Sequence, residues 1–346
     1  MAHPNWSTII YDELIWTKIQ IIRYERSALS QIVLKWHEAV EKIPGALSIQ
    51  PHIRNLRAAA QHFISSDMMR ILEDFAYYSK STISKEMHAA YKLMKEQSFL
   101  AMRSAEPLAF DLLPWKHLPE ETLLEISKIK YLGSDLDQFV NTVKRKQLPA
   151  LRDEFQASMI AGESIDQAAA RLRNAFGYSL TAARATARTA INAASNRGLD
   201  QVYKANKDLM KGVKFTATLD VRSCEICGGY DGSIYSVTGS RPHVPVHINC
   251  RCLFVPIMKS AKELGLGPME LPETARATMD GKAPATLAYP DWFKKQSAKR
   301  QQEILGKKKY AAWKSGDYTP KFLKEQWAGG CVHLEALDIL FAEAEK

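Results

Sequence analysis

Four of the five cysteines in this chain lie between residues 224 and 252, and this clustering constrains the fold more than any other feature of the sequence. Cys224 and Cys227 form a C-x2-C pair, and His247, Cys250 and Cys252 follow after a loop. A C-x2-C turn brings two sulfurs together, and a second pair returning from elsewhere completes the tetrahedron of a zinc ion. The sequence therefore predicts a zinc knuckle.

The full ligand set is open at this stage. His247, Cys250 and Cys252 compete for the two positions left by the C-x2-C pair, and His247 with Cys250 is the first choice. Cys250 and Cys252 are two residues apart, so on a strand they face the same side, and Cys252 is an alternative to either. His243 is the weakest candidate.

Two other interpretations of the cysteines are buried small hydrophobes and disulfides. The first residues, Met-Ala-His-Pro-Asn-Trp-Ser, lack the pattern of a secretory signal, and no uncharged apolar run approaches the length of a membrane span. We therefore expect a reducing cytoplasm, which disfavours disulfides. A closed site with four protein ligands is usually structural, so we expect the zinc to stabilise the fold rather than to catalyse.

The composition is that of a globular chain with a basic surface. With 346 residues and 46% hydrophobic residues, the chain is long enough for two or three domains with sizeable cores. Its net charge of +9 is spread along the sequence. This balance suits an acidic or phosphate-bearing partner, and an ordinary solvated surface explains it equally well.

Apolar positions recur at helical spacing through residues 1 to about 210. Helices are predicted at 8–41, 51–65, 67–104, 120–129, 134–161, 165–176 and from 179 or 181 to about 206. We expect Ile43-Pro44-Gly45 to end the first helix, Pro149 to break or kink the fifth, and Gly177 to close the sixth. Ser164 is the expected N-cap of the sixth.

The last of these helices carries a polar stripe. Arg184, Arg188, Asn192 and Asn196 follow one another at four-residue spacing, so they lie on one side of the helix. Two interpretations stand side by side: a solvated face, or a packed polar contact with the zinc module that follows.

The pattern changes at Gly212, where short β-rich runs begin. Strands are predicted at 213–218, 233–237 and 252–256. None is long enough to be stable alone, so the metal is expected to matter for folding. The predicted fold class is mainly α: a helical N-terminal region, a small zinc-stabilised α+β module with short antiparallel strands, and a helical tail. The predicted parts are 1–110, 111–210, 211–258 and 259–346, with a linker at 107–119.

The tail contains a basic cluster with aromatic residues, Trp292, Tyr310 and Trp313, between its cations. The cations are Lys294, Lys295, Lys299, Arg300, Lys307, Lys308 and Lys309. One interpretation is contact with DNA that weakens with salt and ignores sequence; the other is a solvated helix face beside a small core. Cys331 and His333 lie far from the knuckle and are taken as incidental.

The order of these features resembles the phage minor head protein family of the Mu protein F type. The resemblance covers about 130–258, and its most specific part is D-x-R-x-C-x2-C at 220–227 with a later H-x-N-C-R-C at 247–252. Segments at 289–296, 304–306 and 313–316 also resemble the tail that follows this module in such proteins.

The resemblance implies a non-enzymatic, low-copy virion component located in the capsid interior or at the portal vertex, with assembly in the host cytoplasm. Implied partners are the phage portal protein, the major capsid protein or scaffold, and packaged DNA, which the protein accompanies or helps to release. No membrane and no small-molecule substrate is expected. Residues 1–110 are the proposed portal or capsid contact.

Two alternatives belong to other classes. In an HNH-like metal-dependent nuclease, His243, His247 and Asn249 form a hydrolytic site, but the apolar run after Cys252 replaces the helix such a site needs. In a free DNA-binding zinc protein, the knuckle carries cations, but the loop 228–249 has only Arg241. Phosphate-binding loops and the G-x-S-x-G and H-E-x-x-H motifs are absent from the sequence.

Overall fold

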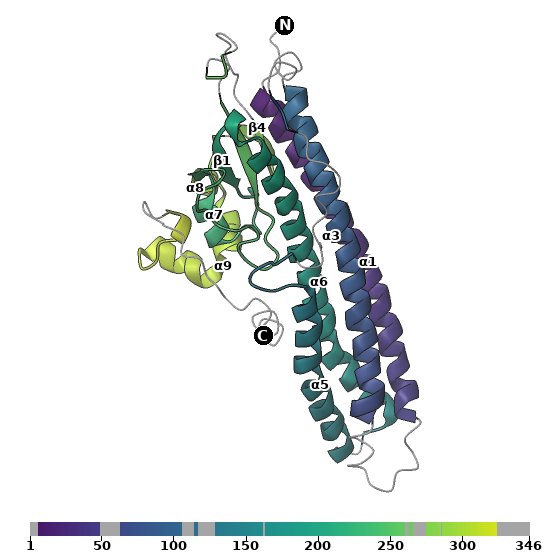
Figure 1. Ribbon diagram of the computed structural model, residues 1–346. Helices are drawn as coiled ribbons and strands as arrows, with labels where there is room; N and C mark the ends of the chain where they lie inside the picture. The colour runs from purple at the N-terminus through teal and green to yellow at the C-terminus, as the bar shows by residue number, and fades with distance from the viewer. Residues whose placement is uncertain are drawn as a thin grey trace.

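The computed structural model describes residues 6–48, 63–105, 114–116, 129–161, 163–259, 263–265, 275–284 and 286–323. Over these residues the protein is mainly helical, with a small three-stranded antiparallel sheet, as predicted. A long helical bundle occupies one side of the molecule, and the sheet and the C-terminal helices lie against the upper part of it (Figure 1).

The bundle consists of four helices, α1 (Trp6–Ser48), α3 (Met69–Ala105), α5 (Leu136–Ile160) and α6 (Ile165–Ala205). A π-helical turn, Phe63–Met68, leads into α3. Helices α1, α3 and α6 lie side by side along the long axis, and α5 lies beside the lower half of α6 (Figure 1). Among the described residues, no helix combines the length and the apolar character needed to cross a bilayer.

Apolar residues at helical spacing fill the centre of the bundle, as expected for amphipathic helices. Phe75 of α3 meets Phe176 of α6 edge to face, with ring centroids 5.3 Å apart. A few polar contacts join the helices as well, such as the 2.8 Å hydrogen bond that Ser27 Oγ of α1 donates to Glu86 Oε1 of α3. One cluster of buried residues includes members of both the bundle and the sheet, from Leu14 to Val255, so the bundle and the sheet share one core.

Two predicted helix ends are wrong. Helix α1 continues through Pro44 to Ser48, and α6 continues through Gly177 as one helix from residue 165 to residue 205. Proline removes one backbone hydrogen bond and glycine costs about 1 kcal/mol in a helix. Both breakers sit beside fully buried residues, Ile43 and Phe176, so tertiary packing outweighs the local preference.

Helix α5 likewise continues through Pro149 rather than breaking there. Ser164 is the N-cap of α6, as predicted: its hydroxyl accepts from the Gln167 N–H, and the Gln167 side chain accepts from the Ser164 N–H, which completes a capping box. Most of the helix predicted at 51–65, most of that at 120–129, most of the linker at 107–119, and the residues Cys331 and His333 lie outside the described residues.

The three-stranded sheet has the order β2-β1-β3 and is antiparallel throughout. Its strands are β1 (Met210–Thr216), β2 (Ile234–Tyr235) and β3 (Leu253–Met258). A short 3-10 turn, Lys207–Leu209, joins α6 to β1, and the helix α7 (Glu225–Tyr230) lies between β1 and β2. Each strand overlaps one predicted from the sequence, and β3 runs two residues further, through Pro256.

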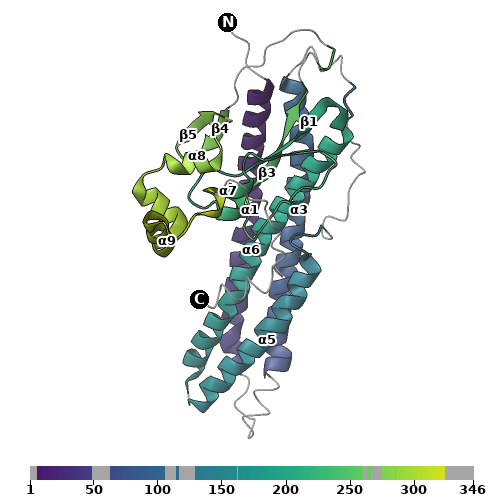
Figure 2. The same cartoon turned by 90° about the vertical axis from the view of Figure 1, so that its left-hand side faces the viewer.

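The tail forms a small unit that stands out from the bundle (Figure 2). It contains the hairpin β4 (Ala275–Thr278) and β5 (Gly281–Pro284), the helices α8 (Tyr289–Lys294) and α9 (Ala298–Ser315), and a 3-10 turn, Lys321–Leu323. The helices were predicted and the hairpin was not. The unit has its own core, which Leu219 of the zinc module joins, with Tyr289, Trp292, Phe293, Leu305 and Phe322.

A buried ion pair fastens the tail to the sheet. The Arg276 guanidinium of β4 donates to both oxygens of Asp231, at 2.8 and 2.9 Å, and the two side chains are 4% and 0% exposed. The Asp231 carboxylate also accepts from the N–H of Ala217, at 2.8 Å, and of Tyr289, at 2.7 Å. Arg276 donates further to the carbonyls of Ala217 and Leu287. Four segments therefore meet at one carboxylate and one guanidinium.

The tail also packs directly on α7. A Cβ placed on Gly228 would lie 2.5 Å from Cδ1 of Tyr289, so only glycine lets this ring approach the helix. Glu225 accepts from Lys309 Nζ at 2.6 Å, from the Lys321 N–H at 3.1 Å, and from the Tyr318 hydroxyl. Because α7 carries part of the cysteine cluster, the tail covers the knuckle.

We predict that Arg276→Ala lowers the free energy of unfolding by about 3–5 kcal/mol, because it leaves Asp231 charged, buried and unpaired. Arg300→Ala is the matched control, since it breaks an exposed pair with Asp280 and should cost about 0–1 kcal/mol. Urea unfolding of the two full-length variants measures the difference. Equal losses for both would contradict the role given to the Asp231–Arg276 pair.

Candidate metal centre

The cysteines and His247 reach one place from three segments. Cys224 is the N-cap of α7 and Cys227 lies in its first turn, where the Cys227 N–H points at Cys224 Sγ from 3.5 Å. His247 and Cys250 lie in the loop before β3, and Cys252 directly precedes that strand. The helical turn brings the first two sulfurs together, and the β1–β3 pairing returns the other ligands to them.

Two groups of possible metal ligands share one residue. Cys224, Cys227 and His247 form the first group and Cys227, Cys250 and Cys252 the second, with all ligand atoms of a group within 4.8 Å of one another. Cys227 Sγ lies 3.0 Å from His247 Nε2 and 3.9 Å from Cys250 Sγ. Two thiolates on a tetrahedral zinc ion are about 3.8 Å apart, given Zn–S bonds of about 2.3 Å. The Cys227–Cys250 separation fits this geometry, and these groups can hold a metal ion.

The ring of His247 is oriented for binding through Nε2. Its Nδ1 lies 2.6 Å from the carbonyl oxygen of Ile248, so this nitrogen carries the proton and donates it. Nε2 then faces the sulfurs and is the nitrogen available to a metal once its own proton is lost. A metal-bound histidine is commonly held in this way by a hydrogen bond at its other nitrogen.

The cluster stabilises charge separation between sulfur and imidazole. A hydrogen bond with Cys227 lowers the pKa of Cys224 to about 4, against the effect of burial, and His247 acts in the same direction. Burial disfavours a charged His247, but hydrogen bonds and charges from Cys224 and Cys250 raise its pKa to about 11. Sulfur binds metals as the thiolate, which this environment favours at Cys224.

The five predicted ligand residues are thus brought together, and Cys227 is common to both groups. His247 lies with the first group and Cys252 with the second, so both stay in competition for the last position. His243 is exposed and belongs to neither group. Three of the four cysteines are buried, and Cys224 is half-buried.

An ion pair between Asp220 and Arg251 joins the two sequence motifs. Arg251 donates to both oxygens of Asp220, at 2.5 and 2.8 Å, which links the segment before Cys224 to the segment between Cys250 and Cys252. The Arg251 pair and the Arg222 N–H lower the pKa of Asp220 against the effect of burial. Ser223 Oγ donates to the Thr218 carbonyl at 2.5 Å and fixes the turn between β1 and α7.

Part of the polar stripe on α6 is a packed contact. Asn192 and Asn196 are 0% and 8% exposed, and Asn196 Nδ2 donates to the Cys252 carbonyl at 3.3 Å. Tyr203 Oη donates to the Phe254 carbonyl at 3.2 Å further along the same helix. Arg188, in contrast, is exposed. The stripe therefore divides: Asn196 binds the segment that carries Cys252, Asn192 is buried beside it, and Arg188 faces solvent.

After Asn196 and Tyr203, Thr189 is a third residue of α6 that hydrogen-bonds the segment with the possible ligands. Its Oγ1 accepts from the Asn249 N–H at 3.0 Å and donates to the Ala185 carbonyl at 2.8 Å. Asn249 has a φ of 59°, in the left-handed region, which asparagine adopts more readily than other residues with a Cβ. Its position in the H-x-N-C-R-C motif is thus explained by the turn between His247 and Cys250.

The basic cluster of the tail lies on α8 and α9, and part of its charge is paired. Lys309 contacts Glu225, Arg300 contacts Asp280 at 2.6 Å, and Lys294 lies 4.0 Å from Asp291. Lys299, Lys307 and Lys308 are exposed. Trp292 is buried in the tail core, and Tyr310 and Trp313 are partly buried against it, which limits the aromatic surface for stacking on bases.

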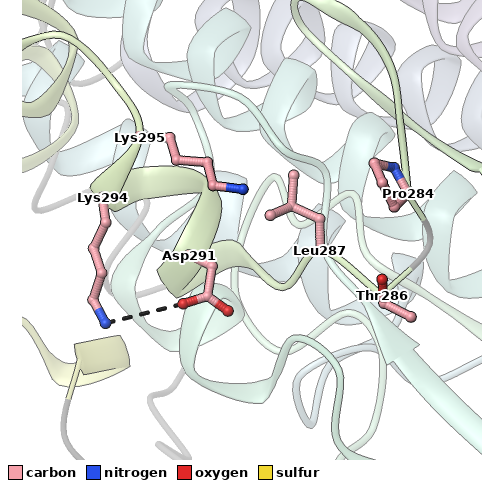
Figure 3. A pocket seen from close by; sticks show the side chains of 6 residues that line it. All are labelled: Pro284, Thr286, Leu287, Asp291, Lys294 and Lys295. Atoms are coloured by element: carbon pink, nitrogen blue, oxygen red, sulfur yellow. Dashed lines mark ion pairs between the residues drawn. The ribbon is translucent and has the colours of Figure 1, made fainter.

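An open hollow lies beside the first of these lysines. It is lined by Pro284, Thr286, Leu287, Asp291, Lys294 and Lys295, and Figure 3 shows the Lys294–Asp291 pair at one side of it. The Leu287 side chain supplies apolar surface, and the two lysines come from the end of α8. The hollow is distant in sequence from the metal ligands.

Sequence reasoning missed three residues that organise this region: Asp231, Arg276 and Lys18. Asp231 lies in the turn between α7 and β2, and Arg276 lies in the hairpin that was not predicted. Lys18 of α1 donates to Asn192 Oδ1 and reaches the zinc module from the opposite end of the sequence. The available signal was weak, because a lone charged residue in an amphipathic helix normally faces solvent.

The fold and site together define a helical protein with a module that carries the cysteines and His247 and packs on helix α6. Residues 150–255 match the model of the family described as Phage Mu protein F like protein. This stretch is similar to that family, as the motifs indicated, and it contains α6, the sheet as far as Val255, and all five possible ligands. No curated protein and no solved structure matches the chain.

We predict that Cys227→Ser abolishes stoichiometric metal binding, because Cys227 belongs to both ligand groups, and that residues 213–258 become sensitive to protease. His243→Ala is the control and should keep the metal. Metal content per chain, measured by mass spectrometry of the purified full-length proteins, tests this directly. Comparing His247→Ala with Cys252→Ala then identifies the fourth ligand, and full metal content in Cys227→Ser would refute the predicted centre.

Proposed function

We propose that this protein is a structural minor head protein of a tailed bacteriophage, present in few copies and located near the portal. The match of residues 150–255 to the Mu protein F like family supports a role in head morphogenesis. The observation that carries the proposal is that the residues of the two sequence motifs either hold the fold or form the cluster of possible ligands. Asp220, Arg251 and Asn249 are engaged in holding the fold, and the cysteines and His247 cluster as ligands.

The proposed metal is zinc in a structural role. Thiolate and imidazole ligands in tetrahedral arrangement suit zinc, and the sheet around them is too small to be stable by itself. Strand β2 has only two residues, and β1 and β3 need the ligand-bearing loops to hold their ends. Metal binding then contributes directly to folding of this region.

The alternative of a nuclease centred on His243, His247 and Asn249 has less support. His243 is exposed and outside the cluster, and both ring nitrogens of His247 have partners within the protein. Asn249 contributes its backbone N–H to Thr189 and shapes a turn. The proposed role is therefore structural rather than hydrolytic.

The N-terminal bundle supplies the proposed contact with the portal, the major capsid protein or the scaffold. Helix α1 has 43 residues and α3 has 37, so each spans about 55–65 Å at the helical rise of about 1.5 Å per residue. Exposed apolar residues on these helices, such as Leu34 and Tyr77, give a partner surface to bind. The elongated shape suits a part that bridges neighbouring proteins in an assembly.

Counting this chain against the major capsid protein in purified mature virions and empty procapsids tests the proposal. Quantitative mass spectrometry should find a few copies per particle in both, because a portal-proximal protein enters during assembly. Absence from both kinds of particle would overturn the proposed function.

We further predict that any binding of DNA by the tail is electrostatic. Replacing Lys307 and Lys308, which are exposed, by glutamine should weaken binding to all sequences and reduce the slope of log K against log salt by about 2. Lys42 and Lys85, exposed on α1 and α3, are the control pair. Mobility shifts at several salt concentrations measure the slope, and an affinity independent of salt would rule out this mode of binding.

A further inference from the structure

A chain of polar contacts connects α1 to the segment that carries Cys252. Lys18 Nζ donates to Asn192 Oδ1, which also accepts from Asn196 Nδ2 at 3.2 Å. Asn196 Nδ2 in turn donates to the carbonyl of Cys252 at 3.3 Å. A residue near the start of the chain thus touches the same side-chain pair that holds a possible metal ligand.

Lys18 is partly buried, and its charge interacts with groups of the metal centre. Burial lowers the pKa of Lys18, and the negative charges of Glu25, Cys250 and Cys252 oppose that effect, while Arg251 adds to it. Glu25 is the carboxylate among these groups, and it lies on the same helix as Lys18. Burial raises the pKa of Glu25. A buried ammonium group needs an anionic partner to offset its desolvation.

Zinc bound by three or four thiolates carries a net negative charge, since each thiolate contributes one negative charge and zinc only two positive ones. Arg251 is the other cation beside these sulfurs, and it is engaged in a two-pronged pair with Asp220. Arg188 lies near Glu25 but is exposed. Lys18 is a further positive charge that acts on Cys250 and Cys252, besides its interaction with Glu25.

We propose that Lys18 supplies the counter-charge of the metal centre and, through Asn192 and Asn196, positions the segment that carries Cys252. The proposal rests on the proposed zinc centre and extends it to the N-terminal helix. Lys18 is a positioning residue, because it contacts no metal ligand atom directly. Residues that support metal ligands in this way commonly change metal affinity 10–100-fold when they are replaced.

Coupling between α1 and the metal follows from this arrangement. If Lys18 stabilises the bound state of the centre, the bound metal stabilises the packed position of Lys18 by the same factor, since linkage is reciprocal. Metal occupancy would then be communicated to the helix that belongs to the proposed partner-binding bundle.

The test compares three full-length variants. Lys18→Met keeps the length of the side chain and removes its charge, Lys18→Arg keeps the charge, and Lys42→Met is an exposed control on the same helix. Competition with a chromophoric chelator should give a zinc dissociation constant about 10-fold higher for Lys18→Met, unchanged for Lys42→Met, and close to the parent for Lys18→Arg. Rescue by arginine separates charge balance from simple packing.

A second measurement needs no variant and protects the test if Lys18→Met fails to fold. Hydrogen exchange of the parent protein is measured with zinc and again after chelation. Chelation should speed exchange more around residue 18 of α1 than around residues 32–43. Equal dissociation constants for parent and Lys18→Met, or no difference in exchange near residue 18, would overturn the proposal. A parent protein that binds no zinc would instead refute the zinc centre itself.

Discussion

Helix α6 is packed on two sides, and the rest of the structure depends on that double contact. One side buries aromatic and aliphatic residues such as Phe176 against α3, and the other offers Thr189, Asn196 and Tyr203 to the backbone of residues 249–254. Buried polar groups without partners are costly, so these hydrogen bonds specify one position of the module on the helix. The ligand-bearing loop is held before any metal is considered.

The cysteine-bearing module then serves as the base for the tail. Asp231 and Arg276 bring the sheet, the hairpin β4–β5 and the start of α8 together at one buried pair. Gly228 of α7 packs against Tyr289 at the start of α8, and Glu225 binds the end of the tail. Such a pair is costly to break although its net contribution to stability is small. Helix α7 therefore connects the possible metal centre to the tail.

Much of the organisation was predictable because it is local. Helical spacing gave the existence and type of α1, α3, α5 and α6, and the C-x2-C and H-x-N-C-R-C motifs gave the cluster of possible ligands. The helix ends at Pro44 and Gly177 were wrong because burial of their neighbours outweighed a local cost of the breaker. The hairpin β4–β5 was missed because its short strands have little alternating pattern of their own.

The sequence by itself determined the chemistry of the centre: thiols and imidazole at spacings that suit a metal, and the family of residues 150–255. Only the tertiary structure decided which polar residues serve that centre. Lys18 and Asn192 are 174 positions apart, and Asp231 and Arg276 are 45 apart, so no local pattern pairs them. Burial supplies the reason, because a charge removed from water must find its partner wherever the fold places one.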